Sequence, residues 1–202
     1  MTRIKLCGLT RPEDIEAANG LLPDYIGFVF APKSRRAVTP EQAAELKGLL
    51  DRRIQAVGVF VDEAPEAVAR LLNAGIIDLA QLHGHEDEAY LSRLRSMTDR
   101  ELIQAFRIRT REDVERSAQS SADYLLLDAG AGEGAVFDWS LLRDLSRPYV
   151  LAGGLDPENV GEALRQLHPF GVDVSSGIET NGQKSPQKMA EFVHNVRKEE
   201  RT

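Results

Sequence analysis

Four residues of the sequence could together move a proton on an anionic substrate. Cys7 ends the apolar run RIKLC, and Asp128 ends the run DYLLLD. A thiol and a carboxyl can serve as base and acid in proton transfer. His83 ends a third apolar run, and the guanidinium of Arg36 could bind a carboxylate. This chemistry requires a fold that brings the four side chains to one place.

Each of these residues also has a structural alternative. A lone free cysteine is more often a small buried hydrophobe than a base. Asp128 could cap or turn the chain at the end of a strand, and His83 could be a half-buried histidine with satisfied hydrogen bonds. Arg36 could be a surface charge. Only the arrangement of the surrounding elements separates these alternatives.

Short strand-like runs recur along the chain, and each is followed by a helical pattern. The predicted strands cover residues 3–7, 25–30, 55–61, 77–83, 102–106, 123–128, 149–154 and 172–176. Eight such units in 202 residues predict a closed (β/α)8 TIM barrel, an α/β fold with residues 1–202 as a single domain. An open doubly wound sheet would also use alternating units.

The segments between the predicted strands carry helix signals. Capping residues and prolines predict helix starts at Thr10 with Glu13, Thr39 with Gln42 and Pro40, Thr110, and Asp156 with Pro157. Apolar residues at helical spacing predict buried faces, as in Ala43, Leu46, Leu49 and Leu50, or Met189, Phe192, Val193 and Val196.

Two turns rich in glycine or serine follow the last two predicted strands. Gly153 and Gly154 end the seventh run, and Ser175, Ser176 and Gly177 end the eighth. Catalytic groups of a barrel lie at the carboxyl ends of its strands, and amides after strands seven and eight often bind a phosphate. Any tight turn favours glycine, so the glycines alone do not indicate a phosphate site. The prediction of phosphate binding rests mainly on the position of these turns after strands seven and eight.

The composition is typical of a globular protein that acts on a small molecule. No apolar run approaches the length of a membrane span, and the N-terminus has no signal-peptide pattern. The single cysteine gives neither an internal disulfide nor zinc spacing, so we expect a cytoplasmic protein without a metal site. A net charge of −7 and a pI near 5.2 argue against a nucleic-acid surface.

A series of motifs runs in order along nearly the whole chain: KLCGLT, GFVFAPKSRRAVTPEQA, VGVFV, QLHG, LLLD followed by FDW, LAGGLDPENV and GVDVSSGIE. Together they resemble the phosphoribosylanthranilate isomerase family of tryptophan biosynthesis. The resemblance implies a (β/α)8 isomerase that converts N-(5-phosphoribosyl)anthranilate to the carboxyphenylamino-deoxyribulose phosphate by an Amadori rearrangement, without metal or cofactor. The expected partner is a small phosphosugar, with no nucleic acid and no membrane, and the protein is expected to be a monomer or homodimer.

The same resemblance implies that Cys7 is the general base and Asp128 the general acid. The acid would protonate the ring oxygen of the ribose, and the base would then take the proton from C2 of the Schiff base. A thiol with a pKa of about 8.5 is mostly protonated at neutral pH, so Cys7 needs positive charge from Arg36 or the substrate iminium. Burial or a nearby anion must raise the pKa of Asp128.

Substrate-binding roles are implied in the same way. The planar fork of Arg36 would face the anthranilate carboxylate, and Arg35 lies beside it in the sequence. Gln81 should face the same way as His83, because side chains alternate along a strand. Asp173 could reach the sugar hydroxyls or fill a polar layer of the barrel. The implied binding residues are Arg36, His83, Asp173 and, for the phosphate, the amides of Gly154, Ser176 and Gly177.

The segment after Asp128 departs from the family pattern. The family usually has a longer glycine-containing loop there, whereas this chain has AGAGEGAVFDW. We expect a differently shaped lid over the acid that keeps Phe137 and Asp138, with Trp139 packed in the helical core.

Two other functions fit part of this pattern. A related phosphosugar barrel could act on the analogous aminoaldose of histidine biosynthesis, but the SRR segment and the cysteine base favour the anthranilate compound. A phosphometabolite-binding scaffold without catalysis would not need both Cys7 and Asp128.

Overall fold

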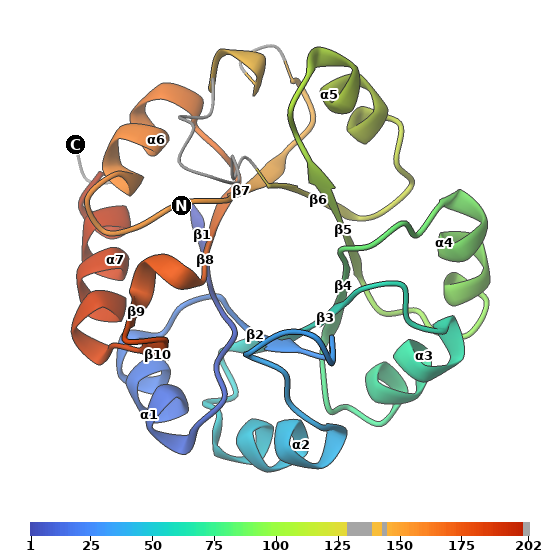
Figure 1. Cartoon of the computed structure of the whole chain (residues 1–202), viewed down its shortest axis with the longest axis horizontal. Helices are drawn as coiled ribbons and strands as arrows, with labels where there is room; N and C mark the ends of the chain where they lie inside the picture. The colour runs from blue at the N-terminus through green and yellow to red at the C-terminus, as the bar shows by residue number, and fades with distance from the viewer. Residues whose placement is uncertain (129–138, 143–144, 200–202) are drawn as a thin grey trace.

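The chain forms a closed ring of parallel strands with helices around it (Figure 1). The computed structural model describes residues 1–128, 139–142 and 145–199. Each strand pairs with the next along the chain, and the eighth pairs with the first. The predicted closed barrel is confirmed, and the open sheet is excluded. The strands are β1 (Arg3–Cys7), β2 (Tyr25–Val29), β3 (Gln55–Phe60), β4 (Leu79–Leu82), β5 (Leu102–Arg107), β6 (Tyr124–Asp128), β7 (Tyr149–Ala152) and β8 (Gly171–Val174).

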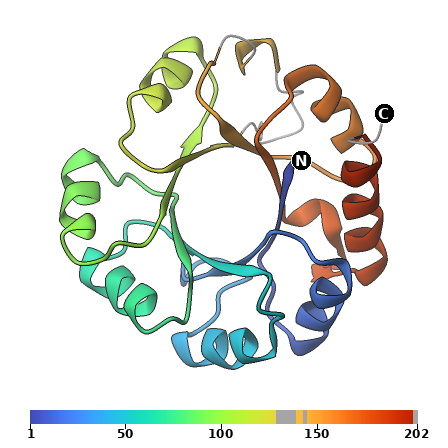
Figure 2. The ribbon, with the colours of Figure 1, turned by 180° about the vertical axis from the view of Figure 1, so that it is seen from behind.

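Helices cover the outside of the ring, as the view from behind also shows (Figure 2). They are α1 (Pro12–Leu21), α2 (Pro40–Leu49), α3 (Pro65–Asn73), α4 (Glu88–Arg95), α5 (Arg111–Ala118), α6 (Val160–Leu167) and α7 (Pro186–Glu199). Short 3-10 turns lie at η2 (Trp139–Leu142) and η3 (Ser176–Ile178), and a small hairpin of β9 (Glu179–Thr180) and β10 (Gln183–Lys184) follows η3. Within the described ranges, no helix is long and apolar enough to cross a membrane.

Two of the predicted helix starts are confirmed, and two are wrong. Thr39 accepts a hydrogen bond from the amide of Gln42 at the start of α2, and Thr110 begins α5 in the same way. The capping box predicted between Thr10 and Glu13 is wrong, because Pro12 takes the first position of α1. The third helical position is therefore Asp14, whose carboxylate accepts from the amide of Thr10 at 3.0 Å.

The start predicted at Asp156 and Pro157 lies in a turn that precedes α6. The carboxylate of Asp156 accepts hydrogen bonds from the amides of Glu158 and Asn159, at 2.8 and 2.9 Å. This side-chain-held turn delays the helix to Val160, so Pro157 is not in its first turn.

The apolar core has an inner part within the barrel and an outer part between barrel and helices. The predicted buried face of α7 is confirmed, and Trp139 packs partly buried against the outer core, as predicted. In α2 one predicted core residue is wrong, because Leu49 lies beside the buried stripe and is 55% exposed. The inner cluster contains Val57, Leu79, Ile103, Ala105, Leu126, Val150 and Ala152.

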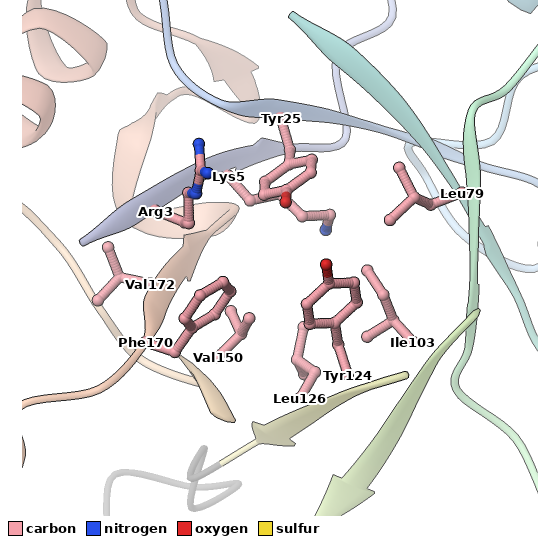
Figure 3. A pocket seen from close by; sticks show the side chains of 10 residues that line it. All are labelled: Arg3, Lys5, Tyr25, Leu79, Ile103, Tyr124, Leu126, Val150, Phe170 and Val172. Atoms are coloured by element: carbon pink, nitrogen blue, oxygen red, sulfur yellow. The ribbon is translucent and has the colours of Figure 1, made fainter. Parts of the chain in front are cut away.

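Aromatic rings line the barrel interior at the amino ends of the strands (Figure 3). Tyr124 and Phe170 stack there with their ring centroids 5.7 Å apart, and Tyr25 lies across the same cavity. Lys5 of β1 also lines this cavity. In barrels of this kind the catalytic groups lie at the opposite end, where the strands finish.

Candidate active site

The structure brings the predicted acid and base to one end of the barrel. Cys7 is the last residue of β1, and Asp128 is the last residue of β6. Because all eight strands are parallel, their last residues lie at the same end. His83 follows β4 directly, and Ser175 follows β8 directly.

Cys7 points into the barrel beside a glycine of the neighbouring strand. The residue is 7% exposed, and its register partner on β2 is Gly27. A Cβ at Gly27 would lie 2.6 Å from the sulfur of Cys7 and 3.2 Å from Nζ of Lys5. The absence of a side chain at Gly27 therefore leaves the room in which the thiol and the ammonium meet.

The pKa of Cys7 results from two opposing effects. Burial raises the pKa of the thiol, and the positive charge of Lys5 lowers it, with burial the stronger of the two. Lys184 acts in the same direction as Lys5. Arg36 is one of two expected sources of this charge, and this expectation is corrected because Lys5 is the main cation of the protein acting on Cys7. The other expected source, the substrate iminium, stays a prediction.

Lys5 is held by a buried carboxylate. Its Nζ lies 2.9 Å from Oδ1 of Asp173, and the two side chains are 3% and 10% exposed. Burial favours a neutral amine, but the charges of Asp173 and Cys7 outweigh it and raise the pKa of Lys5 above its ordinary value. Lys5 is therefore an ammonium at neutral pH.

This contact also bears on the predicted role of Asp173. Its carboxylate faces Lys5 across the β1–β8 pair, in a polar layer of the barrel. A role toward sugar hydroxyls stays a prediction. Lys5 did not figure in the sequence reasoning, although it lies two residues before Cys7 and must point the same way along a strand.

Asp128 has an imidazole beside it. Nε2 of His83 lies 3.5 Å from Oδ2 of Asp128, and Nδ1 of the same ring lies 3.2 Å from the side-chain amide nitrogen of Gln81. Gln81 is buried and faces the same way as His83, as predicted from alternation. The Gln81 contact therefore holds the ring with Nε2 toward the carboxylate.

Arg36 is held by a carboxylate that the sequence reasoning missed. Its Nε lies 2.5 Å from Oε1 of Glu179, and its Nη2 lies 3.0 Å from Oε2. Arg35 and Lys184 contact the same carboxylate, at 2.5 and 2.8 Å. Burial opposes ionisation of Glu179, but the hydrogen bonds from Arg36 and Lys184 prevail and lower its pKa to about 2. The pair is 143 residues apart in sequence, and no local pattern predicts it.

The stem of Arg36 packs next to Gly8, the residue that follows Cys7. Gly8, which follows Cys7, has a φ of +79°, and a Cβ there would lie 2.5 Å from Cδ of Arg36. On the other side, Nζ of Lys184 donates to the carbonyl oxygen of Ser175 at 2.8 Å. The hydroxyl of Ser175 in turn donates to the carbonyl oxygen of Cys7 at 3.1 Å. The Arg36 cluster and the Cys7 strand end thus form one connected region.

The two predicted phosphate-binding turns lie against each other. Gly153 and Gly154 have φ values of +90° and +68°, in the region that favours glycine. A Cβ at Gly177 would lie 2.0 Å from the carbonyl oxygen of Leu155, so the turn after β8 packs on the turn after β7. Ser176 and Gly177 form the first two residues of η3. Phosphate binding by these turns stays a prediction.

The remaining expectations concern the lid and metals. The predicted lid, with Phe137 and Asp138, lies outside the described residues. Among the residues that are described, no three His, Cys, Asp or Glu side chains gather in a way that could hold a metal ion.

Comparisons with known proteins agree with this arrangement. The family described as N-(5'phosphoribosyl)anthranilate (PRA) isomerase matches residues 4–195. The N-(5'-phosphoribosyl)anthranilate isomerase of Thermoanaerobacter sp. (strain X514) is 42% identical, over 98% of both chains.

Solved structures give the same result. Phosphoribosyl anthranilate isomerase from Thermotoga maritima superimposes with a TM-score of 0.90 at 36% identity, covering 98% of this chain and 100% of that one. A phosphoribosyl anthranilate isomerase in complex with reduced 1-(o-carboxyphenylamino)-1-deoxyribulose 5-phosphate gives a TM-score of 0.88, also at 36% identity and with the same coverage. The chain therefore belongs to the N-(5'-phosphoribosyl)anthranilate isomerase family.

Proposed function

We propose that this chain isomerises N-(5'-phosphoribosyl)anthranilate in tryptophan biosynthesis, with Cys7 as the general base and Asp128 as the general acid. The observation that carries these roles is that Cys7 and Asp128 lie at the same end of the barrel, each beside a polar side chain. Cys7 lies beside the Lys5 ammonium, and Asp128 lies beside His83. Each group therefore has a neighbour that controls its charge or its orientation.

Asp128 would begin the reaction by protonating the ring oxygen of the ribose. The C1–O bond breaks, the ring opens, and the anthranilate nitrogen supplies the electron pair that forms a C1=N iminium. His83 orients the carboxyl from 3.5 Å, so the proton is delivered from a fixed direction.

Cys7 would then take the proton from C2 as a thiolate. The C–H electron pair moves into a C1=C2 bond and neutralises the iminium nitrogen, giving an enol-amine. A proton added at C1 and one lost from the C2 hydroxyl complete the ketone, so the reaction is a net isomerisation. The charge of Lys5 stabilises the thiolate during this step, which offsets part of the cost of ionising a buried thiol.

The other predicted residues would bind the two anionic ends of the substrate. Arg36 would bind the anthranilate carboxylate, and the turns at Gly154 and at Ser176 and Gly177 would bind the phosphate. These groups would place C1 and C2 of the sugar between the acid and the base. We further propose that residues 1–202 act as one catalytic domain, as a monomer or homodimer, in the cytoplasm where a free thiol stays reduced.

The assay is direct. Freshly prepared phosphoribosylanthranilate is supplied to the purified protein, and the loss of its anthranilate-type fluorescence is followed against a protein-free control. We expect protein-dependent loss with saturation kinetics. No loss above the control would reject the proposed function. Turnover of only the aminoaldose of histidine biosynthesis would reassign the substrate.

A further inference from the structure

One side of the Arg36 guanidinium is already occupied. A guanidinium has five N–H donors, which form a side-on fork of Nε and Nη2 and an end-on fork of Nη1 and Nη2. Glu179 takes the side-on fork, with contacts of 2.5 Å from Nε and 3.0 Å from Nη2. The end-on fork is the edge that remains for a second carboxylate.

Glu179 is held firmly enough to set the direction of Arg36. Its side chain is 5% exposed, and the buried Lys184 donates to Oε1 at 2.8 Å. Nζ of Lys188 donates to the backbone carbonyl of Glu179 at 2.9 Å. The carboxylate therefore belongs to the fixed β9–β10 hairpin and is not carried on a loose side chain.

The orientation of Arg36 matters because its stem lies close to the base. Cδ of Arg36 occupies the space beside Gly8, the residue after Cys7. A rotation of the guanidinium would therefore move a substrate carboxylate relative to Cys7, and small misplacements of a reacting atom are costly.

We propose that Glu179 is a positioning residue that presents the end-on fork of Arg36 to the anthranilate carboxylate and so determines the preference for a carboxylate-bearing substrate. This inference rests on the proposed function, in which Arg36 binds that carboxylate.

The proposal predicts a change in KM opposite to the change that a simple charge effect would cause. Replacing Glu179 by glutamine leaves Arg35, Arg36 and Lys184 without their shared anion. Charge alone would then favour an anionic substrate and lower KM. Loss of orientation raises KM, because a glutamine offers one acceptor and one donor to a fork of two donors.

The experiment compares the wild type with Glu179→Gln on two substrates. One is phosphoribosylanthranilate, and the other is its analogue built on aniline, which lacks the carboxylate. We expect Glu179→Gln to raise KM for the first substrate about 10-fold, the effect of weakening a charge-assisted pair, with a smaller change in kcat. For the aniline analogue, we expect a poor wild-type reaction and little further loss in the variant.

A matched control is Glu199→Gln. It removes a carboxylate that contacts Arg165 at 2.5 Å, and this pair joins α7 to α6 in the outer ring of helices. We expect both KM values to stay at the wild-type level. Thermal unfolding of each variant shows whether it is folded at the assay temperature.

Each result decides the proposal. An unchanged or lower KM for phosphoribosylanthranilate in Glu179→Gln overturns it, as does an equal loss on both substrates. If Glu179→Gln does not fold, the variant Glu179→Asp replaces it. Aspartate keeps the charge, but its shorter side chain cannot reach both Nε and Nη2 of Arg36 from the same backbone. A raised KM for phosphoribosylanthranilate in Glu179→Asp supports the proposal, and an unchanged KM overturns it. Failure of the proposed function is distinct, since the wild type itself would then not turn over phosphoribosylanthranilate.

Discussion

At the scale of single residues, the pKa of Cys7, the proposed base, depends on the buried neighbour Lys5. Burial raises the pKa of Cys7 and is the strongest influence on it, and the positive charge of Lys5 is the main effect that opposes burial. Lys5 can do so because Asp173 keeps it charged. The proximity of Lys5 and Cys7 can be predicted from the sequence RIKLC, because side chains two residues apart on a strand point the same way. The contact with Asp173 cannot be predicted locally, since Asp173 lies 168 residues away from Lys5.

Lys5→Met should therefore move the pH dependence of the reaction. The Lys5 charge lowers the pKa of Cys7, so its removal raises that pKa. The rising limb of kcat/KM with pH then moves to higher pH, and activity at neutral pH falls about tenfold for each pH unit that the limb moves. The measurement is the pH–rate profile of the wild type and the variant.

The double variant Lys5→Met/Asp173→Asn controls for a purely structural effect. It removes the buried carboxylate that the single variant leaves without a counter-charge. The rising limb of its kcat/KM should still lie at higher pH than that of the wild type, because Lys5 affects the pKa of Cys7 more than Asp173 does. Identical limbs in all three proteins would show that Lys5 does not tune the base.

The variant Asp128→Asn tests the proposed role of Asp128 as the acid. The amide keeps the shape of the side chain but has no transferable proton, so we expect kcat to fall by about 10² or more. Steady-state kinetics of the folded variant gives the answer. Normal turnover would mean that another group opens the ribose ring.

At the scale of elements, the sequence predicts strands and misplaces some helix starts, for physical reasons. The strands of this barrel are short apolar runs that are buried along most of their length, so length and apolar composition identify them. The start of a helix depends on which side chain accepts hydrogen bonds from the first backbone amides. Asp14 rather than Glu13 accepts at α1, and Asp156 holds a turn ahead of α6.

The contact between the two phosphate-side turns gives a prediction at this scale. Gly177→Ala would place a Cβ 2.0 Å from the carbonyl oxygen of Leu155, so the turns after β7 and β8 must separate. We expect a loss of about 1–3 kcal/mol in the free energy of unfolding, as for overpacked sites, and a raised KM. Urea unfolding and steady-state kinetics measure the two effects.

Gly48→Ala is the control for this substitution. A Cβ at Gly48 in α2 would meet nothing within 4 Å, and alanine is the better helix former by up to about 1 kcal/mol. The control should be as stable as the wild type or more so. If Gly177→Ala behaves like Gly48→Ala, the two turns do not constrain each other.

At the scale of the whole molecule, buried and partly buried ion pairs join distant parts of the chain. Lys5 and Asp173 connect β1 to β8, where the barrel closes, and Arg36 and Glu179 connect the segment after β2 to the β9–β10 hairpin. The sequence predicts the strands from local composition, and it predicts the roles of the motif residues from their resemblance to a known family. It does not predict these pairs, because their partners meet only when the ring has closed.

Glu179 also gives the fold a predictable response to acid. Its pKa is about 2 in the folded chain, against 4.5 for the unperturbed group. A group with a lowered folded pKa stabilises the fold above its unfolded pKa and loses that effect as pH falls through the folded value. The stability difference between wild type and Glu179→Gln should be constant above about pH 5.5 and shrink between about pH 4.5 and 2.

Urea unfolding of both proteins across this range measures that difference. The same series for Glu199→Gln controls for the general loss of carboxylate charge. A difference that does not change between pH 6 and pH 3 would contradict the contribution assigned to Glu179.

The central claim is that Cys7 is the base that takes the C2 proton, and Cys7→Ser tests it most directly. The measurement is kcat/KM for phosphoribosylanthranilate in the wild type and in the variant, with thermal unfolding to show that both are folded. A hydroxyl is a far weaker base than a thiolate, so we predict a loss of at least about 10² with the fold intact. A folded Cys7→Ser protein that turns over the substrate at nearly the wild-type rate would contradict the assignment of the base.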